Sequence, residues 1–593
     1  MRELGGWFTT DGTPGPDMPA ADNNAASRFT SEGGACQVRG GWIARDGEGR
    51  IAALIGHPQW QDPPAGQDPA QTLLDRYRRD GEQLFARLSG DFALAILDPV
   101  ARRLLVGIDR LGRFPLYISR IPGGVAFGSA IDRLPNAATL DRTPSPDGLY
   151  HYLFFHMLPA PVSLFADVEK LQGAHCLRLD SQNLRIAPYW QPRFEEPAQA
   201  DMGALGEELH RLLDASVDKL TDPGKTGAFL SGGLDSSTVA GKLAQLHPGE
   251  ADTFSIGFDA PGYDEIAYAR IAAQHFKTRP HEYYVSPDDV VDAIPLIAAS
   301  YDEPFGNSSA LPAYFCARLA ADSGTTRLLG GDGGDELFAG NARYAKQGVF
   351  ELWSRQPALA RRLLEPLFTH LPRASLLGKA RSYVEQARIP LPDRLQTYNY
   401  LHRLSLTAMF EPGFLAQVHT EGPWDLMRDI YRRPEAASSL NRMMYLDWQQ
   451  TLADNDLRKV SRMCELAGVD VAYPMLDDAL VDFSCRIPSA MKLHKGRLRH
   501  FYKNAMSGFL PEAILDKKKH GFGLPFGVWM REHTPLRELA YDGLLRFKSR
   551  GILQPAFIDR LITLHREGHA AYYGELVWVL MMLDLWLETH KPR

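Results

Sequence analysis

The first third of the chain carries short apolar runs whose spacing predicts β-strands. Ile51, Ala53 and Ile55 alternate with residues of the opposite strand face after the turn Asp46–Gly49, and residues 92–97 and 104–108 are almost continuously apolar. Strands that are apolar on both faces are typical of stacked sheets, because each face needs a cover. The pattern therefore predicts a β-sandwich domain over residues 1–194.

A polar segment, residues 195–201, separates this region from one in which strands and helices alternate. Residues 253–258 form an alternating strand, and residues 264–276 have helical spacing. Such alternation predicts an α/β domain with a doubly wound parallel sheet, which binds ligands at the carboxyl ends of its strands. From about residue 350 the pattern is mainly helical, so we expect a second domain over residues 195–593 with helical additions.

One stretch of the second domain, Gly227–Ser237, predicts a buried strand, a glycine turn and the start of a helix. Two glycines alone would fit an ordinary strand-to-helix turn, but the full Ser-Gly-Gly-Leu-Asp-Ser-Ser string is typical of pyrophosphate binding. No Gly-Lys-Ser/Thr follows, so the loop is not a Walker A loop, and loops of this other kind usually serve cleavage of ATP between its α and β phosphates. We expect ATP contacts from Phe229, Ser231, Gly232, Gly233, Leu234, Asp235, Ser236, Ser237, Ile256 and Gly331.

A second glycine-rich stretch, Gly330–Asn341, follows the apolar pair Leu328 and Leu329. Its carboxylates Asp332, Asp335 and Glu336 would repel one another unless a cation lay between them. A solvated acidic turn is the alternative, but the position after a predicted core strand favours a cation site.

Composition narrows the class of protein. The 593 residues carry a formal net charge of −7, which argues against a protein that mainly binds nucleic acid. The start of the chain lacks a signal-peptide core, and the late apolar run Leu576–Met582 is too short to span a bilayer. We expect a cytoplasmic enzyme with no nucleic-acid or membrane partner. The cysteines are widely spaced, so we expect reduced, mostly buried thiols: Cys36, Cys176, Cys316, Cys464 and Cys485.

The helical region is rich in aromatic residues. They are suited to line a peptide site, but the better interpretation is helix core: Tyr398, Tyr400, Phe410 and Trp448.

Several of these stretches resemble class B asparagine synthetases: Ala86–Ala93 near the front, and both glycine-rich stretches in the second domain. The resemblance implies a glutaminase-like, Ntn-type front domain and an ATP-pyrophosphatase synthetase domain. It also implies that Asp235 and Asp335 share Mg²⁺ and that Asp332 takes the place of a catalytic Glu. In the late stretch Lys517–Phe526, Lys519 matches the family's phosphate-contacting lysine.

The front domain departs from that family at its first residues. The family's glutaminase begins, after removal of Met, with a cysteine that attacks glutamine. Here Arg2 follows Met1, and Cys36 lies well inside the chain. We therefore expect a glutaminase-like domain that lacks its nucleophile and releases no ammonia from glutamine.

An amine that does not come from glutamine is expected to belong to the substrate itself, which points to ring closure. The motifs resemble most those of lasso-peptide cyclases of bacterial peptide biosynthesis. This resemblance implies ATP-dependent joining of an Asp or Glu side chain of a core peptide to the peptide's N-terminal amine, with ATP and Mg²⁺ as cofactors. Its expected partners are the precursor peptide, a leader peptidase and a leader-recognition protein.

Three alternatives stay open at this point. An ammonia-dependent asparagine synthetase would share every catalytic residue. A tRNA-modifying enzyme of the same ATP class is disfavoured by the acidic balance and by the absence of a Cys-x-x-Cys pair. A non-catalytic peptide-binding scaffold is disfavoured because Asp235, Asp332, Asp335 and Lys519 occur together.

Overall fold

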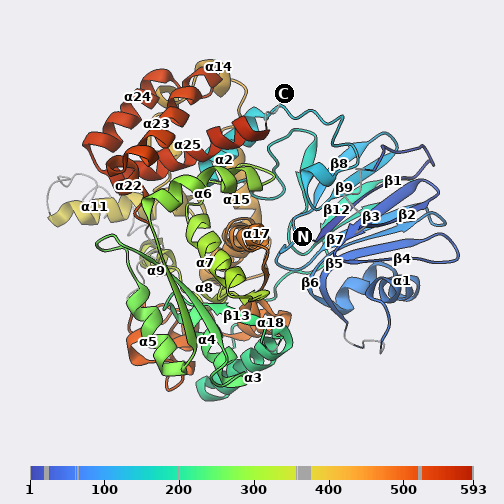
Figure 1. Ribbon diagram of the computed structural model, residues 1–593, viewed down its shortest axis with the longest axis horizontal. Helices are drawn as coiled ribbons and strands as arrows, with labels where there is room; N and C mark the ends of the chain where they lie inside the picture. The colour runs from blue at the N-terminus through green and yellow to red at the C-terminus, as the bar shows by residue number, and fades with distance from the viewer. Residues whose placement is uncertain are drawn as a thin grey trace.

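A computed structural model describes residues 2–18, 26–60, 62, 66–197, 199–222, 224–354, 357, 376–517 and 524–590. Its front part is a sandwich of two six-stranded antiparallel sheets, and its second part is built on a five-stranded parallel sheet with helices around it (Figure 1). The predicted α/β class, with a front β-sandwich and a doubly wound sheet, is confirmed.

The front sandwich has the strand orders β10-β8-β9-β1-β3-β2 and β12-β11-β7-β6-β5-β4. Its strands are β1 (Glu3–Thr9), β2 (Ala26–Ser31), β3 (Gly34–Arg39), β4 (Trp42–Arg45), β5 (Ile51–Trp60), β6 (Leu88–Asp98), β7 (Arg103–Ile108), β8 (Tyr117–Ile121), β9 (Gly124–Gly128), β10 (Val168–Lys170), β11 (His175–Leu179) and β12 (Leu184–Pro188).

Both faces of the central strands are covered, as their apolar sequences predict. Ala93, Ala95 and Leu97 of β6 face the other sheet, while Leu94 and Ile96 pack under helix α1 (Pro69–Asp80). The predicted hairpin is also present, because β6 pairs antiparallel with β7 from Ala93–Ile108 to Asp98–Arg103. A strand between two apolar layers needs no polar face, which explains the absence of alternation.

The second sheet has the order β15-β14-β13-β16-β17, and all its pairs are parallel. Helices α4 and α5 pack together on one face, and α7 and α17 pack together on the other (Figure 1). The elements are α3 (Met202–Leu220), β13 (Thr226–Phe229), α4 (Leu234–Leu246), β14 (Asp252–Phe258), α5 (Ile266–Phe276), β15 (Arg279–Val285), α6 (Pro287–Ser300), α7 (Ala310–Asp322), β16 (Arg327–Leu329), α8 (Gly334–Phe338) and β17 (Asp470–Ala472).

One helix of the helical region is wider than an α-helix. Residues Trp448–Leu457, labelled η4, form a π-helix between α16 (Ser439–Asp447) and α17 (Arg458–Ala467). The other elements are α2 (Pro146–Phe155), α9 (Ala342–Ser354), α11 (Leu376–Ala387), α12 (Tyr400–Arg403), α15 (Gly422–Arg432), α18 (Asp478–Arg486), α20 (His500–Ala505), α22 (Phe526–Glu532), α23 (Thr534–Phe547), α24 (Pro555–Glu567) and α25 (Ala570–His590).

The last helix is a core element. α25 packs against α22, α23 and α24, and Val577, Leu580 and Met581 are completely buried. The helix is longer than the apolar run Leu576–Met582 indicates, and among the described helices α25 alone is long and apolar enough to cross a membrane. However, 72% of its most apolar 18-residue segment is buried inside the protein. Such burial is what a core helix shows, and the cytoplasmic location stays a prediction.

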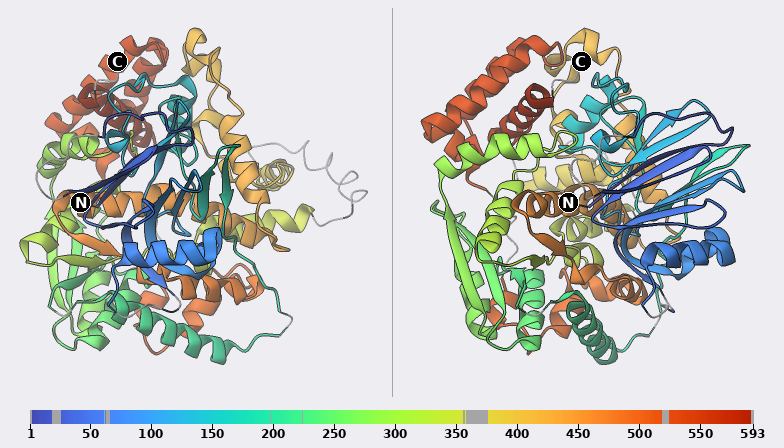
Figure 2. Two further views of the ribbon diagram at one scale, coloured as in Figure 1. Left: turned by 90° about the vertical axis from the view of Figure 1, so that its right-hand side faces the viewer. Right: turned by 45° about the vertical axis from the view of Figure 1, so that its right-hand side comes forward.

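The two domains lie side by side (Figure 2), and charged residues form hydrogen bonds between them. Arg113 bonds to Asp91 at 2.6 Å within the front domain and also donates to the carbonyl oxygen of Val471 in β17. Asp478 of α18 accepts from the Gly90 backbone N–H at 2.9 Å. The predicted linker carries no helix or strand among its described residues, as expected.

Candidate active site

The strand-to-helix loop has the geometry that its glycines predict. Gly232 has a φ of +68°, and a Cβ there would collide with the backbone of Tyr268. The Ser231 and Ser236 hydroxyls lie 3.0 Å apart, and the Ser231 N–H donates to Ser236 Oγ at 3.2 Å. Helix α4 begins directly after Gly233 without a side-chain cap. Its first N–H groups are thus available to an anion.

The other residues predicted to contact ATP surround this loop. Phe229, Leu234 and Ile256 are partly buried near the carboxyl ends of β13 and β14, and Gly331 lies so close to the loop that a Cβ on it would meet the Ser236 nitrogen at 2.6 Å. Ser237 is completely buried beneath the loop. Their roles as nucleotide ligands stay predictions.

Asp235 and Asp335, the expected metal ligands, are brought together around one guanidinium group. Arg499 Nη1 donates to Asp235 Oδ2 at 2.7 Å and to Asp335 Oδ1 at 3.1 Å, and Arg499 Nη2 also bonds to Asp235. Arg499 is 4% exposed. Although burial lowers its pKa, the two carboxylates raise it overall. The geometry therefore shows that a positive charge is accommodated between these carboxylates.

These two carboxylates fit Mg²⁺ only together with a phosphate ligand. In the described part of the chain, no group of three or more His, Cys, Asp or Glu side chains is placed so that it could hold a metal ion by itself. Magnesium in nucleotide sites is commonly held by one or two carboxylates plus substrate phosphates. The uncapped start of α4, on the same loop as Asp235, is where such phosphates would lie.

Asp332 faces a different cation. Burial raises its pKa to about 6, and the charge of Lys459 in α17 opposes that rise. Lys459 is itself held by Asp456, with Nζ 2.8 Å from Oδ1. Asp332 is partly exposed, so it is an ionisable carboxylate that is accessible beside the loop and changes charge near pH 6.

The third carboxylate of the acidic stretch does not join the others. Glu336 is 8% exposed in α8, and burial, reinforced by Asp335, raises its pKa well above the ordinary value. The expectation of one cation among three carboxylates is therefore corrected: Arg499 contacts only Asp335 of the three, Lys459 faces Asp332, and the raised pKa of Glu336 favours its uncharged form.

The lysine-rich stretch reaches the loop through a residue that had no predicted role. Lys517 Nζ donates to the Gly232 carbonyl oxygen at 3.3 Å and pairs with Glu265 at 3.0 Å. Lys519 lies outside the described residues, so its phosphate contact stays a prediction. The sequence places Lys517 in a run of three lysines. Nothing in that run indicates which lysine contacts the loop.

Three of the four aromatic residues named above are helix core, as expected: Tyr400, Phe410 and Trp448 are buried. Tyr398 differs, because it is 50% exposed. Tyr398 and Tyr400 both lie at a cavity of about 400 Å³ between α2, the segment around residues 395–403 and the π-helix. Other residues at this cavity are Phe155, His156, Arg343, Gln396, Asn399, Arg403, Asp447, Gln450, Thr451, Asn455, Tyr572 and Glu575.

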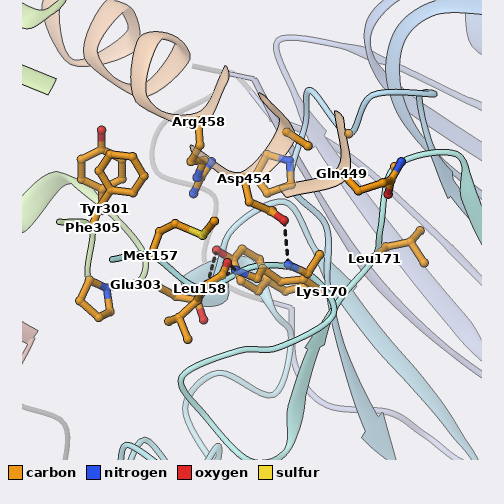
Figure 3. A pocket seen from close by; sticks show the side chains of 17 residues that line it. Met157, Leu158, Lys170, Leu171, Tyr301, Glu303, Phe305, Gln449, Asp454 and Arg458 are labelled. Atoms are coloured by element: carbon orange, nitrogen blue, oxygen red, sulfur yellow. Dashed lines mark hydrogen bonds and ion pairs between the residues drawn. The ribbon is translucent and has the colours of Figure 1, made fainter. Parts of the chain in front are cut away.

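A smaller pocket of about 40 Å³ lies at the junction of the two domains (Figure 3). Its charged side chains are paired within the protein: Lys170 Nζ lies 2.8 Å from Glu303, and Asp454 accepts from the Ala160 N–H at 2.8 Å. Burial raises the pKa of Asp454 to about 6. Such mutual pairing is typical of a structural cluster.

The thiols of the front domain are unsuited to nucleophilic attack. Cys36 is completely buried, and burial raises its pKa to about 12; burial likewise raises the pKa of Cys176 to about 11. A thiol attacks as its thiolate, which neither residue forms appreciably near neutral pH.

The fold and the site thus define an ATP-pyrophosphatase-type synthetase domain joined to a glutaminase-like sandwich. Comparison with protein families agrees. Residues 208–588 match the family described as asparagine synthase, and residues 65–190 match a glutamine amidotransferase domain. The chain therefore belongs to the asparagine synthase family, a family of ATP-dependent, AMP-forming carbon–nitrogen ligases.

Its curated relatives are distant, and two of them match over most of this chain and of their own length. Asparagine synthetase [glutamine-hydrolyzing] 1 of Bacillus subtilis is 25% identical over 522 residues, which cover 87% of this chain and 80% of the relative. A putative asparagine synthetase [glutamine-hydrolyzing] of Mycobacterium bovis is 28% identical over 527 residues, covering 87% and 79%. A solved glutamine phosphoribosylpyrophosphate amidotransferase from B. subtilis has a TM-score of 0.21, 8% identity and coverage of 56% and 81%, and this likeness is too weak to carry an argument.

Proposed function

We propose that the protein is an AMP-forming amide synthetase that activates a substrate carboxylate with ATP and takes its amine from a source other than glutamine. The observation that carries this proposal is the placement of Asp235 and Asp335 about one positive charge, next to an uncapped helix start, with Asp332 facing a second cation, Lys459.

In the proposed reaction, an oxygen of the substrate carboxylate attacks the α-phosphorus of ATP, and pyrophosphate leaves. The amine then attacks the resulting acyl-adenylate, forming the amide and releasing AMP. The N–H groups at the start of α4 bind phosphate oxygens, and Lys519 is proposed to contact the departing pyrophosphate. Asp235 and Asp335 would hold Mg²⁺, whose contribution when bound is to offset negative charge on the phosphates.

Asp332 is assigned to the second step. An α-amine has a pKa of about 7.7–8.0 and attacks only when it is neutral. As a carboxylate, Asp332 accepts a proton from the attacking nitrogen, either directly or through a water. Its pKa of about 6 keeps it ionised at neutral pH while leaving it a better base than an ordinary Asp.

Two acceptors are compatible with this chemistry. The names of the relatives favour aspartate as the carboxylate, although they give glutamine as the nitrogen source; ammonium takes its place in this proposal because the front-domain thiols are buried and protonated. The cavity beside the π-helix favours a larger substrate, and the proposal for it is an isopeptide macrolactam of the lasso-peptide kind, with a leader peptidase and a leader-recognition protein as partners.

The test is pyrophosphate release from ATP and Mg²⁺, with the product mass recorded. The acceptors to compare are aspartate with ammonium, aspartate with glutamine, and a leader-cleaved peptide that carries an internal Asp or Glu. Ammonium-dependent asparagine or a peptide lighter by one water would each support amide synthesis and identify the acceptor. If none of the tested carboxylates led to pyrophosphate release, a non-catalytic scaffold would be favoured. If glutamine supported amide formation as well as ammonium does, the proposed nitrogen source would be contradicted.

A further inference from the structure

We propose that the cavity of about 400 Å³ beside the π-helix is the acceptor site, and that it takes an acidic peptide whose distal carboxylate binds at Lys346 and Arg403. This inference deepens the proposed amide synthesis and rests on it. It concerns the distal carboxylate, a substrate group that does not react. Recognition of that group would define the class of substrate.

The cavity shares its walls with the elements that carry the catalytic groups. Arg343 lines it from the start of α9, two residues after the acidic stretch ends. Asn455 of the π-helix lines it as well, and the next residue, Asp456, holds the Lys459 that faces Asp332. A substrate in this cavity would therefore contact the start of α9 and the π-helix, the two elements that are nearest in sequence to the acidic stretch and to Lys459.

One wall offers a hydrogen-bond donor that the protein itself does not use. Gln450 is 6% exposed, and its Nε2 has no hydrogen-bond partner among the described residues. A buried amide N–H without a partner is costly. A carbonyl oxygen of a bound ligand would satisfy it, and peptide bonds supply such oxygens at every residue.

Two cations flank Tyr398: Arg403, which lines the cavity, and Lys346, which reaches the Tyr398 ring from α9. Lys346 Nζ lies 4.1 Å from the centroid of the Tyr398 ring, and the Arg403 guanidinium carbon lies 5.1 Å from it. Within the described part of the chain, neither has an ion pair with a carboxylate. Burial and the charge of Arg403 lower the pKa of Lys346, as expected for like charges held close together.

The other charged side chains at the cavity are Arg343, Asp447 and Glu575, and Glu575 Oε1 lies 3.8 Å from His156 Nδ1. Arg343 is neutralised by Asp447, which also accepts from the Tyr344 hydroxyl. Unpaired positive charge is therefore concentrated at the Tyr398 edge, away from the acidic stretch. An anion there would relieve the repulsion between Lys346 and Arg403 and would form charge-assisted hydrogen bonds.

Size and lining indicate the chemical class of the ligand. A volume of about 400 Å³ falls in the range of about 300–1,000 Å³ that is usual for extended ligands, and a single amino acid would fill it only in part. Amide side chains at Gln396, Asn399 and Gln450 alternate with aromatic rings along it. An acidic peptide matches the donor, the rings and the two cations together.

The test uses the full-length protein and paired synthetic peptides. Each peptide has a free N-terminus, one internal Asp and a glycine spacer of varied length, and ends either in a free carboxylate or in a carboxamide. We expect the KM of the wild-type protein for the carboxylate peptide to be about ten- to a hundredfold lower at the best spacer, the worth of one hydrogen bond to a charged group. Pyrophosphate release gives kcat and KM.

Substitutions locate this preference. Lys346→Ala and Arg403→Ala should each raise KM for the carboxylate peptide towards that of the carboxamide, with kcat, the KM for ATP and the carboxamide kinetics unchanged. Arg211→Ala, which removes an exposed arginine of α3, is the matched control and should change none of these. Both cavity residues are exposed, so the variants should fold as the wild type does, which thermal unfolding checks.

The outcomes separate this inference from the proposed function. Equal kinetics for the two peptides at every spacer length, or equal effects of Lys346→Ala and Arg403→Ala on both, would overturn the distal-carboxylate site. Turnover of aspartate without turnover of any peptide would overturn it too, but would leave amide synthesis standing. If no acceptor led to pyrophosphate release, the proposed function itself would be overturned.

Discussion

The two domains contain similar charged residues but use them in opposite ways. In the front sandwich, Arg113 and Asp91 are buried together and bond to each other and to the neighbouring domain. In the second domain, helix α4 begins without a side-chain cap beside Asp235, and Gln450 lines a cavity with its Nε2 unpartnered among the described residues. Charges that are matched internally fix structure, whereas groups arranged around a space are available for chemistry. This difference predicts which substitutions damage activity and which damage stability.

The largest effect is expected at the paired aspartates. Asp235→Asn or Asp335→Asn removes one negative charge from the proposed Mg²⁺ and phosphate site. We expect pyrophosphate release to fall by roughly 10²–10³-fold or more, the cost of losing one strong electrostatic contact to the reacting phosphates. Glu208→Gln, on the exposed side of α3, is the control. Wild-type release rates in either aspartate variant would break the assignment of chemistry to this group.

Asp332→Asn should separate the two steps of the reaction. Adenylation should stay within a few fold, while amide formation falls by roughly 10²–10⁴-fold, the usual contribution of a general base. Because burial raises the Asp332 pKa to about 6, the wild-type amide rate should drop as pH falls through 6, where the carboxylate becomes protonated. Single-turnover assays across pH measure this. An unchanged pH profile in Asp332→Asn would refute the role.

In the front domain, Arg113→Met should reduce stability and leave the chemistry of the folded protein intact. It strands Asp91, whose side chain is 15% exposed; burial raises the pKa of Asp91, but Arg113, the hydrogen bond with His57 and the charge of Arg2 together lower it to about 2. Breaking such a pair costs about 3–5 kcal/mol, measured by urea unfolding at pH 7. A carboxyl with a lowered pKa contributes stability above its unfolded value of about 3.9, and this contribution is lost as pH falls towards 2. The wild-type advantage over Arg113→Met should therefore shrink in acid, and an advantage that grew would contradict the pairing.

The smallest effect is expected at the front-domain thiols. Cys36→Ala and Cys176→Ser should leave ammonium- or peptide-supported amide formation within about twofold, because burial keeps both thiols protonated. Glutamate release from glutamine should be undetectable before and after the substitutions. Glutaminase activity that disappears with either cysteine would remove the contrast between the domains.

Local chemistry explains what could be predicted from the sequence. The phosphate-type loop is one contiguous string, so its strand, turn and helix follow from neighbouring residues, and the apolar runs of β6 and β7 likewise predicted a covered sheet. Arg499 was missed because it lies 264 residues from Asp235 in sequence and only folding brings the two together. Asp335 and Glu336 are adjacent and chemically alike, yet one faces Arg499 and the other is buried. The direction of each side chain in α8, which the sequence pattern did not resolve, decides their roles.

The π-helix places three consecutive residues against three different parts of the molecule. Asp454 bonds to the front domain at Ala160, Asn455 accepts from Asn307 at 2.8 Å and lines the large cavity, and Asp456 holds Lys459. A π-turn contains one more residue than an α-turn and relies on i→i+5 hydrogen bonds. Deleting a single residue here would change the direction in which every following side chain points from the helix axis. We therefore expect this helix to tolerate changes of side chain far better than changes of length.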